Sequence, residues 1–239
     1  MKSVESIAII PARGGSKRIP HKNIKNFCGQ AIIGYSIQAA HECDCFDRVI
    51  VSTDCPDIAR IAREFGAETP FIRPADISDD HASTLPVIRH AIQFCEEESG
   101  NKLKHACCLY ATAPFVRAED LRHGHETLTG NKSVEFAFSV TSFPFPIQRA
   151  LYIDPATSQT RMFSPEHEQS RSQDLQESYH DAGQFYWGTR DAFIQHDGIF
   201  TAHSMPVILP RERVQDIDTP EDWRRAELMF NALRQTPHD

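Results

Sequence analysis

Two patterns of hydrophobic and polar positions alternate over the first 140 residues. Short runs rich in Val and Ile predict buried strands, and longer segments with apolar residues every three or four positions predict helices. The expected strands are residues 6–12, 48–53, 105–111 and 135–141, with 69–73 as a further candidate. The expected helices are residues 31–43, 56–65, 83–98 and a segment that begins at Arg117. This order predicts βαβ crossovers and a mainly parallel sheet with helices on both faces, an α/β fold.

The alternation stops at residues 142–188 and resumes near the end of the chain. This stretch is rich in Pro, Gln and Ser, but it carries too many aromatic residues for a flexible linker. We expect an insertion that covers the site or forms a subunit interface, within a single domain of residues 1–239. A late strand at 205–209 and an amphipathic helix at 219–234 follow, with Thr219 as the helix cap and Pro220 in the first turn.

The charge of the chain is unevenly distributed. The net charge is −8, which argues against a broad nucleic-acid-binding face. Five cations nevertheless gather within residues 13–25, at Arg13, Lys17, Arg18, Lys22 and Lys25. A basic cluster on an acidic chain indicates a small polyanionic ligand such as a triphosphate, and the alternative is a solvated run of charges.

The cysteines and the N-terminal segment bear on the cellular compartment. Seven cysteines without a CxxC pair are typical of a reducing compartment and argue against a zinc cluster. The first apolar run, residues 7–10, is too short for a secretory signal, and no run has the length of a membrane span. We therefore expect a soluble, cytoplasmic protein that binds neither nucleic acid nor membrane.

The segment from Ile9 to Asn23, IIPARGGSKRIPHKN, is the most distinctive part of the chain. A predicted strand leads into two adjacent glycines flanked by cations. Glycine lets backbone N–H groups approach an anion closely, and the cations can neutralise phosphate charge. The GxxxxGK[ST] and GxGxxG patterns are absent, so kinase, GTPase and dehydrogenase functions lose their main support. Arg13, a planar fork of donors, and Lys22, a mobile point charge, are candidates for neutralising the phosphate charge of such a ligand.

Asp216 and Asp218 form a second candidate site. Residues i and i+2 of an extended segment lie on the same side, so both carboxylates can bind one hard cation. The alternative is an acidic cluster that favours the N-terminus of the following helix.

These motifs together resemble the CMP-sialic acid synthetases, the cytidylyltransferases of nonulosonic acids. The nucleotide loop is the strongest match, and further matches follow in the family's order over nearly the whole chain, at residues 73–75, 79–80, 83–84, 109–114 and 215–220. Residues 139–149, 171–175 and 179–188 are more similar to the branch that acts on pseudaminic acid. Relatives that act on ordinary sialic acid tend to have Gln-Pro-Thr-Ser-Pro at 110–114 and Asn-Gly at 182–183. These departures fall in the sugar-facing motifs, which implies a changed sugar with the activity retained.

The resemblance implies a Rossmann-like, mainly parallel sheet of the nucleotide-diphospho-sugar transferase type and a homodimer. It implies Mg²⁺ as cofactor, held by Asp216 and Asp218. The implied CTP-binding residues are Ala12, Arg13, Gly14, Gly15, Ser16, Lys17, Lys22, Asn23, Arg73 and Thr84. The implied sugar-binding residues are Tyr110, Thr112, Gln148, Arg171, His180, Gln184 and Tyr186. The implied catalytic residues are Arg13 and Lys22, which would stabilise the α-phosphate and the departing pyrophosphate, together with Asp216 and Asp218. Arg171 is a candidate to bind the sugar carboxylate, and related dimers imply that it can do so in the site of a neighbouring subunit.

The expected reaction joins CTP and pseudaminic acid to give the CMP-sugar and pyrophosphate, with the sugar's anomeric hydroxyl attacking the α-phosphorus. Three alternatives stay open. The first is the same chemistry on N-acetylneuraminate, legionaminate or a 3-deoxy-octulosonate. The second is a transferase that makes a neutral nucleotide sugar, and the third is a non-catalytic nucleotide-binding module.

Overall fold

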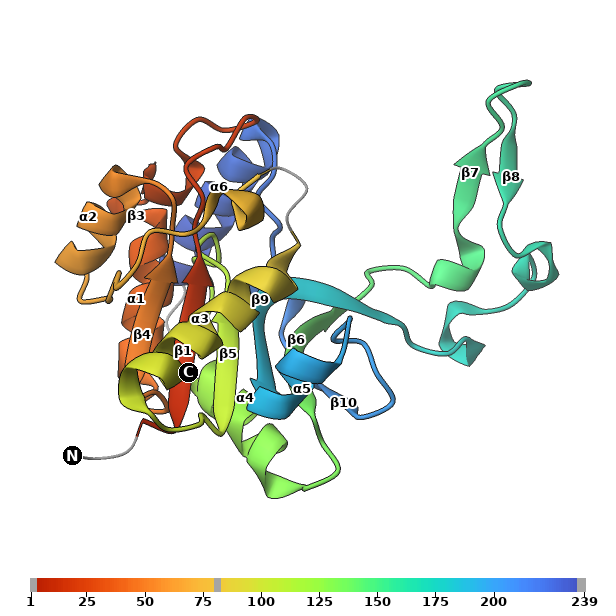
Figure 1. Ribbon diagram of the computed structural model, residues 1–239. Coiled ribbons are helices and arrows are strands. Elements are labelled where there is room, and N and C mark those ends of the chain that lie inside the picture. Colours follow the sequence, from red (N-terminus) through yellow and green to blue (C-terminus); the bar gives the residue numbers. More distant parts are fainter. Residues whose placement is uncertain (1–3, 80–82, 236–239) are drawn as a thin grey trace.

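The computed structural model describes residues 4–79 and 83–235, and its core is a six-stranded sheet (Figure 1). The strand order is β10-β6-β9-β5-β1-β4. Strand β9 is antiparallel to β5 and β6, whereas the pairs β1–β4, β1–β5 and β10–β6 are parallel, which confirms the predicted mainly parallel α/β fold. The strands are β1 (Ser6–Pro11), β4 (Arg48–Ser52), β5 (His105–Leu109), β6 (Phe136–Ser142), β9 (Tyr179–Thr189) and β10 (Ser204–Ile208).

Helices cover both faces of the sheet because successive side chains of a buried strand point to opposite faces. Ala8 and Ile10 of β1 pack in the cluster with α1 (Ile32–Glu42), α2 (Pro56–Glu64) and α4 (Ala118–Gly130). Ile7 and Ile9 pack in the other cluster, with α3 (Thr84–Ser99) and α5 (Arg190–Gln195). Both faces of β1 are therefore fully buried, as expected for a central parallel strand.

A third hydrophobic cluster joins the two ends of the chain. The final helix α6 (Pro220–Gln235) packs Trp223 edge-on against Phe27, with ring centroids 5.4 Å apart. Phe27 belongs to a small hairpin of β2 (Asn26–Phe27) and β3 (Gln30–Ala31) that follows the glycine loop. Ile19 of the loop and Ile217 before α6 complete the cluster. This packing places the Asp216–Asp218 segment beside the cationic loop.

Residues 143–178 form an arm that projects away from the sheet (Figure 1). The arm contains the hairpin of β7 (Leu151–Ile153) and β8 (Thr160–Met162) and the 3₁₀ turns η3 (Ile147–Arg149), η4 (Pro165–His167) and η5 (Ser172–Asp174). Residues 179–188 do not belong to the arm, because they form β9 in the interior of the sheet. The predicted insertion therefore extended too far at its C-terminal end, since Phe185, Tyr186 and Trp187 pack as strand residues of the core.

The other expected elements are close to the observed ones, with one error. Residues 69–73 form no strand, and only Glu68 makes an isolated bridge, to Ile50. Pro70 within this segment and Pro74 directly after it lack the N–H groups that a strand ladder requires. In the part of the chain that the structure describes, no helix is long and apolar enough to cross a membrane.

Candidate active site

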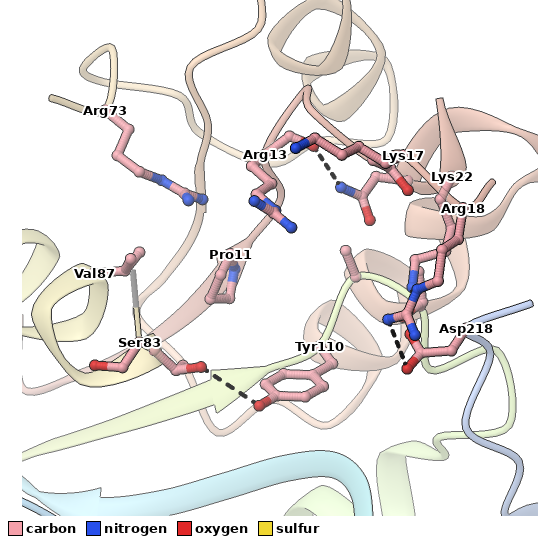
Figure 2. A pocket seen from close by; sticks show the side chains of 15 residues that line it. Pro11, Arg13, Lys17, Arg18, Lys22, Arg73, Ser83, Val87, Tyr110 and Asp218 are labelled. Atoms are coloured by element: carbon pink, nitrogen blue, oxygen red, sulfur yellow. Dashed lines mark hydrogen bonds and ion pairs between the residues drawn. The ribbon is translucent and has the colours of Figure 1, made fainter. Parts of the chain in front are cut away.

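A pocket of about 490 Å³ lies beyond the carboxyl ends of β1 and β5, where ligands bind in open α/β sheets. Figure 2 shows the guanidinium groups of Arg13 and Arg73 pointing into it, with Arg18 and Asp218 on the opposite side. Five cations and one carboxylate line this pocket of a chain whose net charge is −8. The lining residues are Pro11, Arg13, Ser16, Lys17, Arg18, Lys22, Asn23, Arg73, Ser83, Thr84, Val87, Tyr110, Ala111, Thr112 and Asp218.

The glycine loop is held in place by a hydrogen bond to Asp54, which follows β4, and by a hydrogen bond within the loop. The N–H of Gly14 donates to the Asp54 carboxylate at 2.8 Å, and the Asn23 amide donates to the Arg13 carbonyl at 2.9 Å. A Cβ at Gly14 would lie 2.9 Å from the Cβ of Cys55, so a larger residue cannot take its place without a shift. The first glycine is therefore required for packing, and the loop presents its cations from a fixed backbone.

Arg73 is the most buried cation of the pocket, with 5% of its surface exposed. Its guanidinium donates to the hydroxyl and the carbonyl of Ser52. Burial lowers its pKa below the ordinary value, the Asp54 carboxylate partly offsets this, and Arg13 adds to the decrease. Arg73 forms no ion pair with a carboxylate of the described residues, so an anion bound in the pocket would stabilise its charge.

Lys22 and Arg18 connect the cationic loop to Asp218. The Lys22 ammonium lies 3.3 Å from one Asp218 oxygen and donates to the Ile217 carbonyl at 2.7 Å, while Arg18 lies 2.9 Å from the other oxygen. Ile217 is 1% exposed, and Arg213 nearby pairs with Asp120 of α4 at 2.5 and 3.0 Å. The carboxylate segment is thus anchored before the pair by Arg213 and within it by Ile217 and Asp218.

Asp216 and Asp218 fit a metal site that needs further ligands from a substrate. Desolvation by the surrounding chain raises the pKa of Asp216, and the neighbouring Asp218 carboxylate raises it further. Such mutual repulsion favours a divalent cation. No cluster of three or more His, Cys, Asp or Glu side chains that could hold a metal occurs among residues 4–79 and 83–235. Mg²⁺ is commonly bound by one or two carboxylates together with substrate phosphates, which suits this open pair.

A second pocket, of about 890 Å³, adjoins the first and shares Tyr110 with it. Tyr110 is therefore the wall between them, and its ring lies 5.3 Å from that of Tyr186. The second pocket is lined by three carboxylates and two arginines, whereas the first is lined by five cations and one carboxylate. Its lining residues are Tyr110, Thr141, Ser142, Pro144, His180, Asp181, Ala182, Gly183, Tyr186, Arg211, Glu212, Val214, Gln215, Asp216, Arg225 and Met229.

The structure brings most of the predicted site residues to these two pockets. The first contains Arg13, Ser16, Lys17, Lys22, Asn23, Arg73, Thr84, Tyr110, Thr112 and Asp218, and the second contains Tyr110, His180, Tyr186 and Asp216. Gly14 and Gly15 form the backbone of the loop without lining either pocket. Ala12 is fully buried, and its N–H donates to the Ser52 carbonyl, so it extends the sheet pairing and does not line the nucleotide pocket.

Three predicted sugar-binding residues lie away from both pockets. Gln184 is 3% exposed and donates to the Arg213 carbonyl at 2.6 Å, because it lies in the buried part of β9. Gln148 and Arg171 lie in the projecting arm, where Gln148 donates to the Gln176 carbonyl and Arg171 pairs with Asp174 at 2.7 Å. Within one chain, these side chains do not meet the other site residues.

Sequence reasoning left several residues of the pockets unassigned, and Asp181, Arg18, Ser83, Arg211 and Arg225 are the charged or polar ones that matter most here. Arg18 was noted in the cationic run but not assigned to the site, although its position beside Lys17 was a signal. Ser83 lines the first pocket at the N-terminus of α3, which the Ser-Thr helix start indicated. Arg211 and Arg225 of the second pocket follow no local pattern that could have identified them. Asp80, part of one matching motif, lies outside the described residues.

The chain is similar in sequence to cytidylyltransferases and CMP-sugar synthases. The chain is 44% identical to a pseudaminic acid cytidylyltransferase of Campylobacter jejuni, over 98% of this chain and 99% of that protein. It is 30% identical to a CMP-N,N'-diacetyllegionaminic acid synthase of Legionella pneumophila, over 96% and 97% of the two chains.

Solved structures of more distant proteins have the same fold. A CMP:2-keto-3-deoxy-manno-octonic acid synthetase complexed with CTP superposes with a TM-score of 0.69 at 15% identity, over 96% of this chain and 99% of that chain. A 4-diphosphocytidyl-2C-methyl-D-erythritol synthase from Anaerococcus prevotii gives a TM-score of 0.62 at 11% identity, over 95% and 99%. The cytidylyltransferase family itself matches residues 7–227. With this match over nearly the whole chain, and with a cationic loop facing paired carboxylates, the protein belongs to the cytidylyltransferase family.

Proposed function

We propose that this enzyme joins CTP and pseudaminic acid to form CMP-pseudaminic acid and pyrophosphate. The observation that carries the proposal is the shared pocket in which Arg13, Lys22 and Arg73 face Asp218, with a second pocket across Tyr110. The first pocket fits a triphosphate by charge, and the second has room for an acidic sugar. The similarity to the Campylobacter enzyme over both full lengths supports the choice of sugar.

In this reaction the anomeric hydroxyl of the sugar attacks the α-phosphorus, the bond to the β-phosphate oxygen breaks, and pyrophosphate leaves. Transfer of this kind needs alignment and charge neutralisation more than covalent help. Arg13 and Lys22 neutralise charge that moves onto the leaving group, and the rigid loop fixes their positions. Arg73 holds the triphosphate from the buried side of the pocket.

We propose Mg²⁺ as the cofactor, with Asp216 and Asp218 as its protein ligands. When bound, the ion would neutralise phosphate charge and lower the pKa of a coordinated hydroxyl. To bind the ion, Asp218 would give up part of its ion pairing with Arg18 and Lys22. Asp216→Asn should abolish turnover while the circular dichroism spectrum stays unchanged, and normal turnover in this variant would refute the assignment.

The reaction is tested by incubating the protein with CTP, Mg²⁺ and a panel of acidic sugars, and measuring pyrophosphate. Pseudaminic acid should give the highest kcat/KM. Preference for N,N'-diacetyllegionaminic acid or N-acetylneuraminic acid would refute the choice of sugar while leaving the reaction class intact. Absence of pyrophosphate with every sugar would refute the reaction itself.

We further propose a homodimer in which the arm of one subunit reaches the site of the other. The arm exposes large apolar side chains, among them Phe145 at 78%, Ile153 at 71% and Phe163 at 68% exposed, which a second subunit would cover. Arg171 lies in the same arm and would bind the sugar carboxylate in the partner's site.

Mixed dimers test this arrangement. Arg171→Ala and Lys22→Met should each be inactive alone, and mixing them should restore activity because one site of the mixed dimer has both native residues. A monomer in light scattering, or no recovery on mixing, would contradict the proposal. We also propose that the enzyme acts in the cytoplasm, where CTP is formed, which fractionation of cells would test.

A further inference from the structure

Strand β9 contains a large bulge at the wall of the second pocket. Phe138 of β6 pairs with Tyr186, and Val140 pairs with Asp181. An advance of two residues along β6 therefore corresponds to five residues along β9. Gly183, within the bulge, has a φ of 63°, which glycine adopts without strain. Bulges often redirect a side chain next to an active site. Here the bulge directs Asp181 to the second pocket.

The Asp181 carboxylate is held in one orientation. One oxygen accepts the N–H of Gly183 at 2.8 Å, and the other accepts the hydroxyl of Tyr186 at 2.6 Å. Tyr186 is only 4% exposed, so its ring anchors this contact in the core. Burial, then Tyr110, then the hydrogen bond to Asp181 raise the pKa of Tyr186, so the phenol stays protonated and remains the donor.

Both anchors of Asp181 are uncharged, and no Lys, Arg or His within the described ranges forms an ion pair with it. A carboxylate has about four lone-pair sites, and two neutral hydrogen bonds leave the others available. The residue is exposed on the pocket side. If Asp181 served only to orient the Tyr186 hydroxyl, an uncharged acceptor at this position would be sufficient.

The same side chains connect the second pocket to the first. Tyr186 contacts Tyr110, and the Tyr110 hydroxyl lies 3.5 Å from that of Thr84 in the nucleotide pocket. The hydroxyl groups of Thr84, Tyr110 and Tyr186 thus form a row that starts in the nucleotide pocket. Asp181 lies at the far end of this row. It also repels a carboxylate, so an acidic sugar would bind with its own carboxylate turned away from Asp181.

We propose that Asp181 is a specificity-determining residue that accepts a hydrogen bond from an N–H or O–H donor of the sugar, on the part remote from the reacting hydroxyl. This inference rests on the proposed function, and it adds a residue that is not among the sugar-binding residues expected from the sequence. The bulge, the Gly183 N–H and the Tyr186 hydroxyl preorganise the carboxylate, which reduces the entropic cost of binding.

The test compares Asp181→Asn with the wild-type enzyme, with CTP and sugar varied separately. The Asn side chain has nearly the same shape but no charge, and loss of a charged hydrogen bond should raise the KM for the sugar by about 10- to 100-fold. The KM for CTP and the urea midpoint should stay unchanged. Tyr186→Phe, which removes one anchor and keeps the carboxylate, should raise the KM for the sugar by a smaller factor.

Glu119→Gln is the matched control, because this carboxylate lies on α4 and pairs with Arg122, away from both pockets. It should leave both KM values unchanged. A sugar analogue with hydrogen in place of one acylamino group distinguishes the donors: the effect of Asp181→Asn disappears with this analogue if that N–H is the donor, and it persists if an O–H elsewhere on the sugar is the donor.

Two results would overturn the inference. An unchanged KM for the sugar in Asp181→Asn would show that the carboxylate does not bind it. Equal increases in both KM values, with a lower urea midpoint, would show a structural role only. Failure of the proposed function is a separate result, because the wild-type enzyme would then release no pyrophosphate.

Discussion

Replacing Ile217 with Ala tests whether hydrophobic packing positions the two carboxylates. Ile217 lies between Asp216 and Asp218, is 1% exposed and packs in the cluster with Ile19 of the cationic loop. Removal of three buried carbons costs about 2.4 kcal/mol in transfer free energy, at about 0.8 kcal/mol each. The remaining cavity adds roughly 1 kcal/mol, so the free energy of unfolding should fall by about 3 kcal/mol.

Ile217→Ala should also lower kcat, by more than its effect on the free energy of unfolding can explain. A misplacement of about 1 Å at reacting groups can cost about 100-fold in rate, so kcat should fall by roughly 10- to 100-fold at a temperature where the variant is folded. Ile92→Ala is the control. Ile92 of α3 is fully buried in another cluster and lines neither pocket.

Urea denaturation gives the stability of both variants, and pyrophosphate release under saturating substrates gives kcat. We expect similar losses of stability and a loss of kcat in Ile217→Ala alone. Equal kcat values in the two variants would refute the idea that this side chain positions the carboxylates.

Three further predictions concern binding, packing and pH. Arg73→Met should raise the KM for CTP by about 10- to 100-fold and leave the KM for the sugar unchanged, because the triphosphate loses a charged hydrogen-bond donor. Initial rates measure both constants, and equal increases in the two KM values would contradict the assignment of Arg73 to the nucleotide. Gly124→Ala should lower the free energy of unfolding by about 1–3 kcal/mol in urea, because its Cβ would lie 2.6 Å from Trp187, and an unchanged midpoint would argue against this packing. The hydrogen bond from Arg190 lowers the pKa of Glu96 in the folded protein below its ordinary value of 4.5. The ionised Glu96 therefore stabilises the folded state above pH 4.5, and this stabilisation is lost as the pH falls through the pKa of Glu96 in the folded protein. Glu96→Gln should therefore cost roughly 1–3 kcal/mol at neutral pH and less at about pH 3, and a constant difference in urea would count against this coupling.

The sequence was sufficient for the local elements and for the phosphate-binding loop. The continuous apolar run Ile7–Ile10 in β1 predicts a strand buried on both faces, and helical spacing predicts α1 and α3. The loop could be identified because its glycines and cations are contiguous. Its first glycine is also required by a close contact with Cys55.

Residues whose roles depend on distant parts of the chain could not be placed from the sequence alone. The contact of Lys22 with Asp218 spans 196 positions and depends on the packing of α6 against the β2–β3 hairpin. Asp181 is directed to the second pocket by a bulge that no local pattern predicted.

The sequence by itself therefore determined which chemical groups are present and which segments form strands and helices, because these depend on side-chain type and short-range periodicity. Only the tertiary structure decided which groups share a pocket. Gln184 and Tyr186 illustrate the difference: they are two residues apart on the same strand, yet Gln184 hydrogen-bonds within the core and Tyr186 reaches the second pocket. The physical reason is that burial and orientation are set by the elements that pack around a residue, and these elements are distant in the chain.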